Sequence, residues 1–270
     1  MRKVFLSLLA AAAGVYLSLL AFLWWKQEAL LFLPHPLPVD HRFQVDADVH
    51  ELKVPVPGAE LSALHLRLPQ PKGVVIYLHG NVGNLQSWFT EAAFYRQANF
   101  DLVMPDYRGF GKSTGRIESG AQLHADVWAV WQQVAARYRG QRIVLYGRSL
   151  GTGLAADLAE RLTAQGTPPD LTVLVSPYAS MSELAGEIYP WVPMALLRYP
   201  LDTSRKLANV RGGVLLVHGD ADTLIPVQHS HRLHQRVPTA RLVVVPRATH
   251  DDIHVHPQAR AEFLDALDKL

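Results

Sequence analysis

The residues best suited to chemistry are a serine between two glycines, in the run Gly147-Arg148-Ser149-Leu150-Gly151. An apolar stretch at 143–146 precedes this run, and leucines follow it at helical spacing. A Gly-x-Ser-x-Gly turn between a strand and a helix is typical of a nucleophile elbow, which holds its serine in a strained backbone conformation and needs small residues on both sides. The sequence therefore predicts that Ser149 presents its hydroxyl as a nucleophile.

A serine nucleophile needs a histidine base and a carboxylate that orients the histidine. Two apolar stretches, 214–217 and 242–245, are followed by loops that contain Asp222 and His250 respectively. In an open parallel sheet, the loops after the strands form the active site. Asp220 competes with Asp222 because it lies nearer the end of its strand. The order Ser149, Asp222, His250 is the order of hydrolases with a nucleophile elbow.

A further turn, upstream of the serine, is suited to stabilising negative charge. The apolar stretch 74–78 runs into His79-Gly80-Asn81. This placement predicts an oxyanion hole formed by the backbone N–H groups of Asn81 and Leu150. His79 and His218 each precede a glycine at the end of a strand, so we expect them to be hydrogen-bonded turn residues rather than bases.

Five motifs together resemble the α/β-hydrolase superfamily, and the nearest likeness is the membrane-anchored Bem46-like group. They are the Leu-His-Gly-Asn turn at 78–81, the runs at 106–113, 147–151 and 218–222, and Thr-His-Asp-Asp at 249–252. The resemblance covers roughly Leu52 to Leu270. It implies Ser149 as nucleophile, Asp222 as acid and His250 as base, in an esterase, thioesterase or peptidase whose substrate stays open.

Three other patterns predict different chemistry but fit the chain less well. The run 151–156 matches the glycine spacing of a dinucleotide-binding turn, yet its first glycine lies past the strand. Gly-Lys-Ser at 111–113 has Asp106 where a phosphate-binding loop has its first glycine. The tail 250–256 contains three histidines and two aspartates, which could form a metal site, but surface or structural roles for His254 and His256 are simpler. We expect no cofactor and no metal.

The composition limits the class of protein. A chain of 270 residues with 49% hydrophobic residues can form one α/β domain with a sizeable core. The net charge of +2 comes from mixed charges without a basic block, so nucleic acid is not an expected partner. Without cysteine, the chain has no disulfide, no thiolate nucleophile and no cysteine metal site.

The N-terminus predicts a membrane anchor. The stretch from Val4 to Trp25 is uncharged and long enough to span the hydrocarbon layer, with Arg2 and Lys3 before it and Lys26 after it. A cleaved signal peptide is the alternative, but its apolar region should end well before Trp25. The basic N-terminus favours an N-in orientation, which places the rest of the chain on the outer side, periplasmic in a Gram-negative bacterium.

The alternation of strand-like and helix-like stretches predicts an α/β-hydrolase fold, with a mostly parallel central sheet, helices on both faces and a short lid insertion. Strands are expected near 61–67, 74–78, 102–104, 143–146, 171–175, 214–217 and 242–245, and helices near 86–97, 122–138, 150–163, 228–236 and 257–270. We divide the chain into an anchor at 1–26, a connector at 27–50 and a catalytic domain at 51–270 with a lid near 176–213.

The lid contains an apolar run with prolines at 189–197. This run either roofs a shallow cleft, walled by Tyr178, Trp191 and Met194 and suited to short or medium acyl chains, or packs Trp191 into the core. The sequence as a whole predicts a membrane-anchored serine hydrolase that cleaves an ester or thioester of a small-molecule or lipid-like substrate. The alternatives are a serine peptidase or amidase and a tethered scaffold without activity; the oligomeric state stays open.

Overall fold

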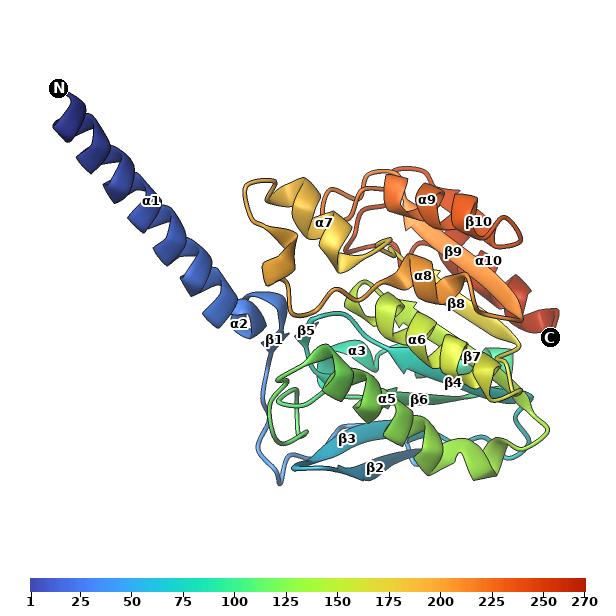
Figure 1. Cartoon of the computed structure of the whole chain (residues 1–270). Coiled ribbons are helices and arrows are strands. Elements are labelled where there is room, and N and C mark those ends of the chain that lie inside the picture. The colour runs from blue at the N-terminus through green and yellow to red at the C-terminus, as the bar shows by residue number, and fades with distance from the viewer.

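A central sheet covered by helices on both faces forms the body of the protein, and one long helix projects from it (Figure 1). The computed structural model describes residues 1–270. The sheet has eight strands in the order β10-β9-β8-β7-β4-β6-β3-β2, parallel from β10 to β6 and antiparallel at β3 and β2. The strands are β2 (Val49–Val56), β3 (Ala59–Leu66), β4 (Gly73–Leu78), β6 (Phe100–Pro105), β7 (Arg142–Arg148), β8 (Leu171–Val175), β9 (Gly213–Gly219) and β10 (Arg241–Val245). The predicted mostly parallel sheet is confirmed.

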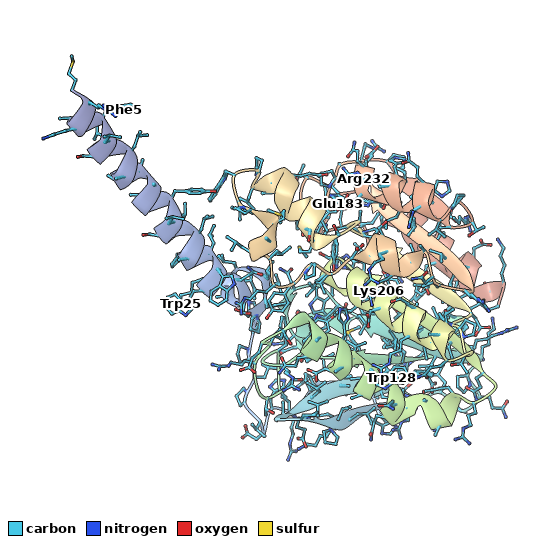
Figure 2. All side chains as sticks on the ribbon, in the orientation of Figure 1. Phe5, Trp25, Trp128, Glu183, Lys206 and Arg232 are labelled. Carbon is cyan, nitrogen blue, oxygen red and sulfur yellow. The ribbon has the colours of Figure 1, made fainter.

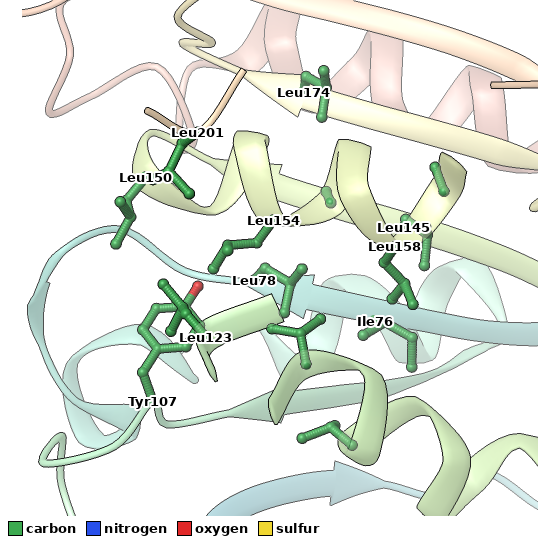
Figure 3. Close-up of a cluster of buried hydrophobic side chains, with 14 of the residues drawn as sticks. Ile76, Leu78, Tyr107, Leu123, Leu145, Leu150, Leu154, Leu158, Leu174 and Leu201 are labelled. Atoms are coloured by element: carbon green, nitrogen blue, oxygen red, sulfur yellow. The ribbon is translucent and has the colours of Figure 1, made fainter. Parts of the chain in front are cut away.

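The alternation of side chains along the central strands creates two cores. In β4, Val74, Ile76 and Leu78 face one side of the sheet, while Val75 and Tyr77 face the other. The first side is covered by α5 (Gly120–Ala135), α6 (Leu150–Ala164), α8 (Thr203–Leu207) and α9 (Gln228–Arg236). The second is covered by α3 (Leu85–Trp88), α4 (Ala92–Ala98) and α10 (Pro257–Asp268). Figure 3 shows leucines of α6 packed on β4 and β7 in the first core.

Two local predictions differ from the structure. The helix expected near 86–97 is divided into α3 and α4, because the backbone of Phe89 leaves the helical region at ψ 58° and ends α3. Strand β2 was not among the expected strands, since its side chains are mostly exposed and it carries Pro55. It pairs with β3 at the edge of the sheet, where such a sequence is tolerated.

The insertion between β8 and β9 contains α7 (Met181–Ile188), a 3₁₀ turn (Met194–Leu196) and α8. Tyr178 is fully buried, so it does not wall an open cleft. Trp191 is 45% exposed, so it does not pack into the core either.

The N-terminal segment consists of α1 (Arg2–Trp25), α2 (Gln27–Leu31) and β1 (Leu33–Pro34). Helix α1 is the one helix long and apolar enough to cross a membrane, and it stands almost wholly clear of the domain. Strand β1 pairs with β5 (Val82–Gly83), directly after the His79-Gly80-Asn81 turn. The residues after α1 are therefore bound to the domain close to the predicted oxyanion turn.

Candidate active site

Ser149 lies in a sharp turn between β7 and α6. Its φ of 51° and ψ of −118° place it in a region that L-residues rarely adopt, as the predicted elbow requires. The flanking glycines are sterically necessary. A Cβ at Gly147 would lie 2.5 Å from the carbonyl oxygen of Gly151, and a Cβ at Gly151 would lie 1.9 Å from the carbonyl oxygen of Leu78.

The structure brings together the three residues predicted to react. The Nε2 of His250 lies 3.0 Å from the Oγ of Ser149, and its Nδ1 lies 2.8 Å from the Oδ2 of Asp222. These residues come from the loops after β10, β7 and β9, at the carboxyl ends of parallel strands of one sheet. Because a carboxylate only accepts, His250 donates from Nδ1 and, when neutral, has Nε2 free to accept the serine proton.

Asp222 is fixed as an acceptor by the backbone of its own loop. Its Oδ1 accepts the N–H of Leu224 at 3.0 Å and that of Ile225 at 2.8 Å. Burial alone would raise the pKa of the Asp222 carboxyl, but the contacts with His218, His250 and the Ile225 N–H outweigh burial and lower that pKa well below its usual range. Asp222 is therefore ionised at neutral pH.

The competing carboxylate, Asp220, has a different role. It is exposed, and its Oδ1 accepts the N–H of Arg247 at 2.6 Å. It thus ties together the loops after β9 and β10 without contacting His250. Of the two aspartates, only Asp222 lies at the imidazole of His250.

The predicted oxyanion hole lies where the 78–81 turn meets the elbow. The Cα of Gly80 faces Ser149, because a Cβ there would lie 3.8 Å from the Cβ of Ser149. The backbone N–H groups of Asn81 and Leu150 make no hydrogen bond within the protein. Leu150 is also the first residue of α6, where the helix dipole adds positive potential. Both donors remain available to an anion formed next to Ser149.

The connector also holds this turn, a contact that sequence reasoning missed. The Nδ2 of Asn81 donates to the carbonyl of Leu31 at 2.8 Å, and its own carbonyl accepts the N–H of Leu33 at 2.8 Å. The side chain of Asn84 donates to the carbonyl of His35 at 2.7 Å. The segment after the N-terminal helix is thus hydrogen-bonded to the turn whose backbone carries one of the two oxyanion donors.

Arg148 is a second residue whose role the sequence did not reveal. It is buried beside the elbow, and its guanidinium donates to the carbonyls of His250 at 2.8 Å and Asp251 at 3.3 Å. It also lies over the Trp88 ring, 4.9 Å from the centroid. Its position next to Ser149 in the elbow motif was the available signal. Arg148 positions the loop that carries His250.

His79 and His218 each make hydrogen bonds within or beside their own turns. His79 is fully buried, donates from Nδ1 to the carbonyl of Gly80 and stacks on Trp88. His218 donates from Nε2 to the carbonyl of Ile225 and contacts Ser230 through Nδ1, and its Nε2 lies 3.3 Å from the Oδ2 of Asp222. Both therefore act as turn residues.

The two histidines of the tail do not gather at a metal site. His256 caps the N-terminus of α10 by accepting the N–H of Gln258. His254 lines a cavity of about 60 Å³, and burial, followed by the charge of Arg148, lowers its pKa to about 4.

Comparison with known proteins decides the family. The model of a family described as serine aminopeptidase, S33, matches residues 69–201. An uncharacterized protein of Mycobacterium tuberculosis is 29% identical over 92% of this chain and 88% of its own length. The lysophosphatidylserine lipase ABHD12 of Danio rerio is 28% identical over 60% of this chain and 46% of its own length. The chain belongs to the α/β-hydrolase superfamily.

Solved structures show the same fold for this α/β hydrolase. A Pyrococcus furiosus esterase superposes with a TM-score of 0.67 over 88% of the chain and 97% of the esterase, at 17% identity. The matched region spans less than half of the length of ABHD12.

Proposed function

We propose that this α/β hydrolase is a serine hydrolase that cleaves an acyl bond of an ester or thioester through an acyl-serine intermediate. The observation that carries the proposal is the connected line of hydrogen bonds from Asp222 through His250 to Ser149. The three residues have the types and the chain order that nucleophilic catalysis by serine needs. The strained elbow supports the proposal, because backbone strain of this kind is characteristic of functional sites.

In the proposed reaction, the Oγ of Ser149 bonds to the acyl carbon while its proton moves to the Nε2 of His250. The carbonyl electron pair moves onto oxygen, where the N–H groups of Asn81 and Leu150 stabilise the charge. The carbonyl re-forms, the bond to the alcohol or thiol breaks, and His250 gives its proton to that leaving group. Water then attacks the acyl-serine, with His250 accepting its proton, and the acid leaves as Ser149 is regenerated.

We infer further that α1 anchors the protein in a membrane. Within its 24 residues, an 18-residue stretch has a mean hydropathy of 2.2, and 6% of that stretch is buried. At a rise of 1.5 Å per residue, the helix is about 36 Å long, enough for a hydrocarbon layer of about 30 Å. Arg2 and Lys3 favour an N-in orientation, with the catalytic domain on the outer side, periplasmic in a Gram-negative bacterium.

The leaving group defines two candidate substrate classes. The lipase and esterase among the similar proteins favour an ester, of a small molecule or a lipid. The serine aminopeptidase description of the matched family favours an amide as the second candidate. A panel of matched p-nitrophenyl esters, thioesters and aminoacyl anilides would rank these classes by kcat/KM.

Labelling with a fluorophosphonate tests the serine mechanism itself. We expect the full-length protein to be labelled and Ser149→Ala to lose all labelling. Ser176→Ala is the matched control, because Ser176 is also buried, follows a strand and has a positive φ, but its hydroxyl has no hydrogen-bond partner. Absence of labelling in the wild type would favour the inactive scaffold, and labelling that survives in Ser149→Ala would refute the nucleophile.

A further inference from the structure

The segment that follows α7 in the insertion, from Ile188 to Leu197 and here named the cap tip, carries no charged side chain. Although it reads IYPWVPMALL, none of its residues is buried. Ile188 is 48% exposed, Tyr189 52% and Trp191 45%. Large apolar side chains that are exposed together mark a surface that another apolar phase covers.

The cap tip lies along the C-terminal half of α1, toward which it points in Figure 1. The hydroxyl of Tyr16 donates to the carbonyl of Trp191 at 2.8 Å. Nearer the domain, the side chain of Gln27 donates to the carbonyl of Leu196 at 3.1 Å and accepts the N–H of Arg198 at 2.6 Å. The tip therefore contacts α1 within its apolar stretch, through Tyr16, and α2 just past the end of α1, through Gln27.

These contacts define how deep the tip would lie if α1 spans a membrane. Trp24, Trp25 and Lys26 form the kind of boundary that marks a membrane interface. Tyr16 lies nine residues before Trp25, which corresponds to about 13 Å along the helix at 1.5 Å per residue. Half of the hydrocarbon layer is about 15 Å thick, so the Trp191 carbonyl falls within it.

The polar atoms at this depth satisfy one another. A tyrosine hydroxyl or a loop carbonyl in hydrocarbon needs a hydrogen-bond partner, because no water is available there. The Tyr16 hydroxyl and the Trp191 carbonyl are each other's partner. The remainder of the tip is mostly apolar and includes two prolines, which lack an N–H. Its other polar side-chain groups are the Tyr189 hydroxyl and the Trp191 indole N–H, which are of the kind found at membrane interfaces.

Charged residues begin where the tip ends. Glu187 precedes it and pairs with Arg232 at 2.6 Å, and the same arginine pairs with Glu183 at 2.9 Å. Arg198 follows it, pairs with Glu28 and lies over the Trp24 ring. In Figure 2, Glu183 and Arg232 lie at the domain end of the cap, and Trp25 lies at the domain end of α1. The charged groups thus stay near the boundary that the tryptophans mark.

We propose that the cap tip inserts into the bilayer beside α1, as a second membrane contact of the protein. The occupant of this apolar surface is the acyl-chain region of the lipid. The inference rests on the proposed anchoring by α1, and it does not depend on the triad. This second contact would fix the orientation of the domain at the membrane, because a domain held at both α1 and the cap tip cannot rotate freely about a single helix.

The absence of cysteine allows a direct test with single-cysteine variants of the full-length protein. Trp191→Cys and Tyr189→Cys would carry an environment-sensitive NBD label, in phosphatidylcholine vesicles with nitroxides on the acyl chains. Ala13→Cys in α1 reports on the anchor, and Gln165→Cys at the far end of α6 is the exposed control. We expect nitroxide to quench the labels at 189, 191 and 13 several-fold more than the label at 165, and soluble iodide to show the reverse order.

The outcomes separate the tip from the anchor. Labels at 189 and 191 that iodide quenches, while the label at 13 stays in lipid, would overturn insertion of the tip and leave the anchor in place. A label at 13 that is in water would overturn both. Fluorophosphonate labelling of the same variants reports on Ser149 independently, so neither result is confused with failure of the hydrolase chemistry.

Discussion

Replacing Asp222 with asparagine tests the proposed role of the carboxylate most sharply, because the structure specifies how the new amide must orient. Two backbone donors, the N–H groups of Leu224 and Ile225, point at Oδ1. The amide oxygen of Asn would keep both bonds, and its NH₂ group would then face the Nδ1 of His250. That group donates, so it stabilises the tautomer with the proton on Nε2. His250 could then no longer accept the proton of Ser149.

The size of the expected loss in kcat follows from the free-energy cost of the opposite orientation of the amide in Asp222→Asn. Turning the amide over would restore the useful tautomer but would leave two backbone donors facing an NH₂ group, at about 1–3 kcal/mol each. A total of about 2–6 kcal/mol corresponds to roughly 30- to 2.5 × 10⁴-fold, at 1.36 kcal/mol per factor of ten. We therefore expect Asp222→Asn to lower kcat by about two to four orders of magnitude. KM should change little, because Asp222 does not face the substrate.

The assay is the initial rate of p-nitrophenyl butyrate hydrolysis by the detergent-solubilised full-length protein, together with the rate of fluorophosphonate labelling. Asp220→Asn is the matched control. Its amide oxygen can still accept the N–H of Arg247, so we expect activity near that of the wild type. More than a tenth of the activity left in Asp222→Asn, or an equal loss in Asp220→Asn, would refute the assigned role.

Three further predictions concern residues that support the site or the fold. Arg148→Met keeps the contact with Trp88 but removes the donors to the His250 loop, so kcat should fall roughly tenfold at unchanged KM; an unchanged kcat would contradict its positioning role. Deleting residues 1–26 should release the protein from membranes and leave fluorophosphonate labelling intact. Deleting residues 1–38 also removes the hydrogen bonds from the connector to Asn81, and should slow labelling about tenfold or more. Equal labelling rates in the two truncated proteins would show that these hydrogen bonds are dispensable. Burial tends to raise the pKa of Asp157, but contacts with His124 and Lys206 lower it to about 2 from 3.8. The ionised Asp157 therefore stabilises the folded protein at pH values above its unfolded pKa, and this stabilisation is lost as the pH falls toward 2. Asp157→Asn should reduce the free energy of unfolding by about 2 kcal/mol at pH 7 and by much less near pH 2. Urea titrations at the two pH values would measure the difference.

The parts of the site that the sequence predicted are those whose constraints are local. Gly147 and Gly151 are needed because the elbow brings backbone against their Cα atoms, and this need is visible in the motif itself. The positions of Asp222 and His250 follow from the parallel sheet, since the loops after its strands share one edge. The choice between Asp220 and Asp222 was less predictable, because it depends on which carboxylate the turn after β9 directs at the imidazole.

The contacts that the sequence could not predict join residues distant along the chain. The pairing of Leu33 with Val82, and the bond from Asn81 to Leu31, have no periodicity or composition that would reveal them. Arg148 is similar, since its partners at 250 and 251 are close only once β10 lies in the sheet. The apolar run in the insertion was visible, but whether it covers a cleft or stays exposed depends on where α1 lies.

The N-terminal segment makes several of these unpredicted contacts, which follow one another along its length. From the membrane side inward, Tyr16 contacts Trp191, Gln27 binds Leu196 and Arg198, and the residues after α2 bind the turn of Asn81. A passive tether would need none of these contacts, because a flexible connector holds a domain at a membrane equally well. These contacts instead fix the insertion relative to α1 and the oxyanion turn relative to the connector. Truncation after residue 26 therefore removes the anchor together with the contact of Tyr16 with the insertion, and truncation after residue 38 also removes a support of the site.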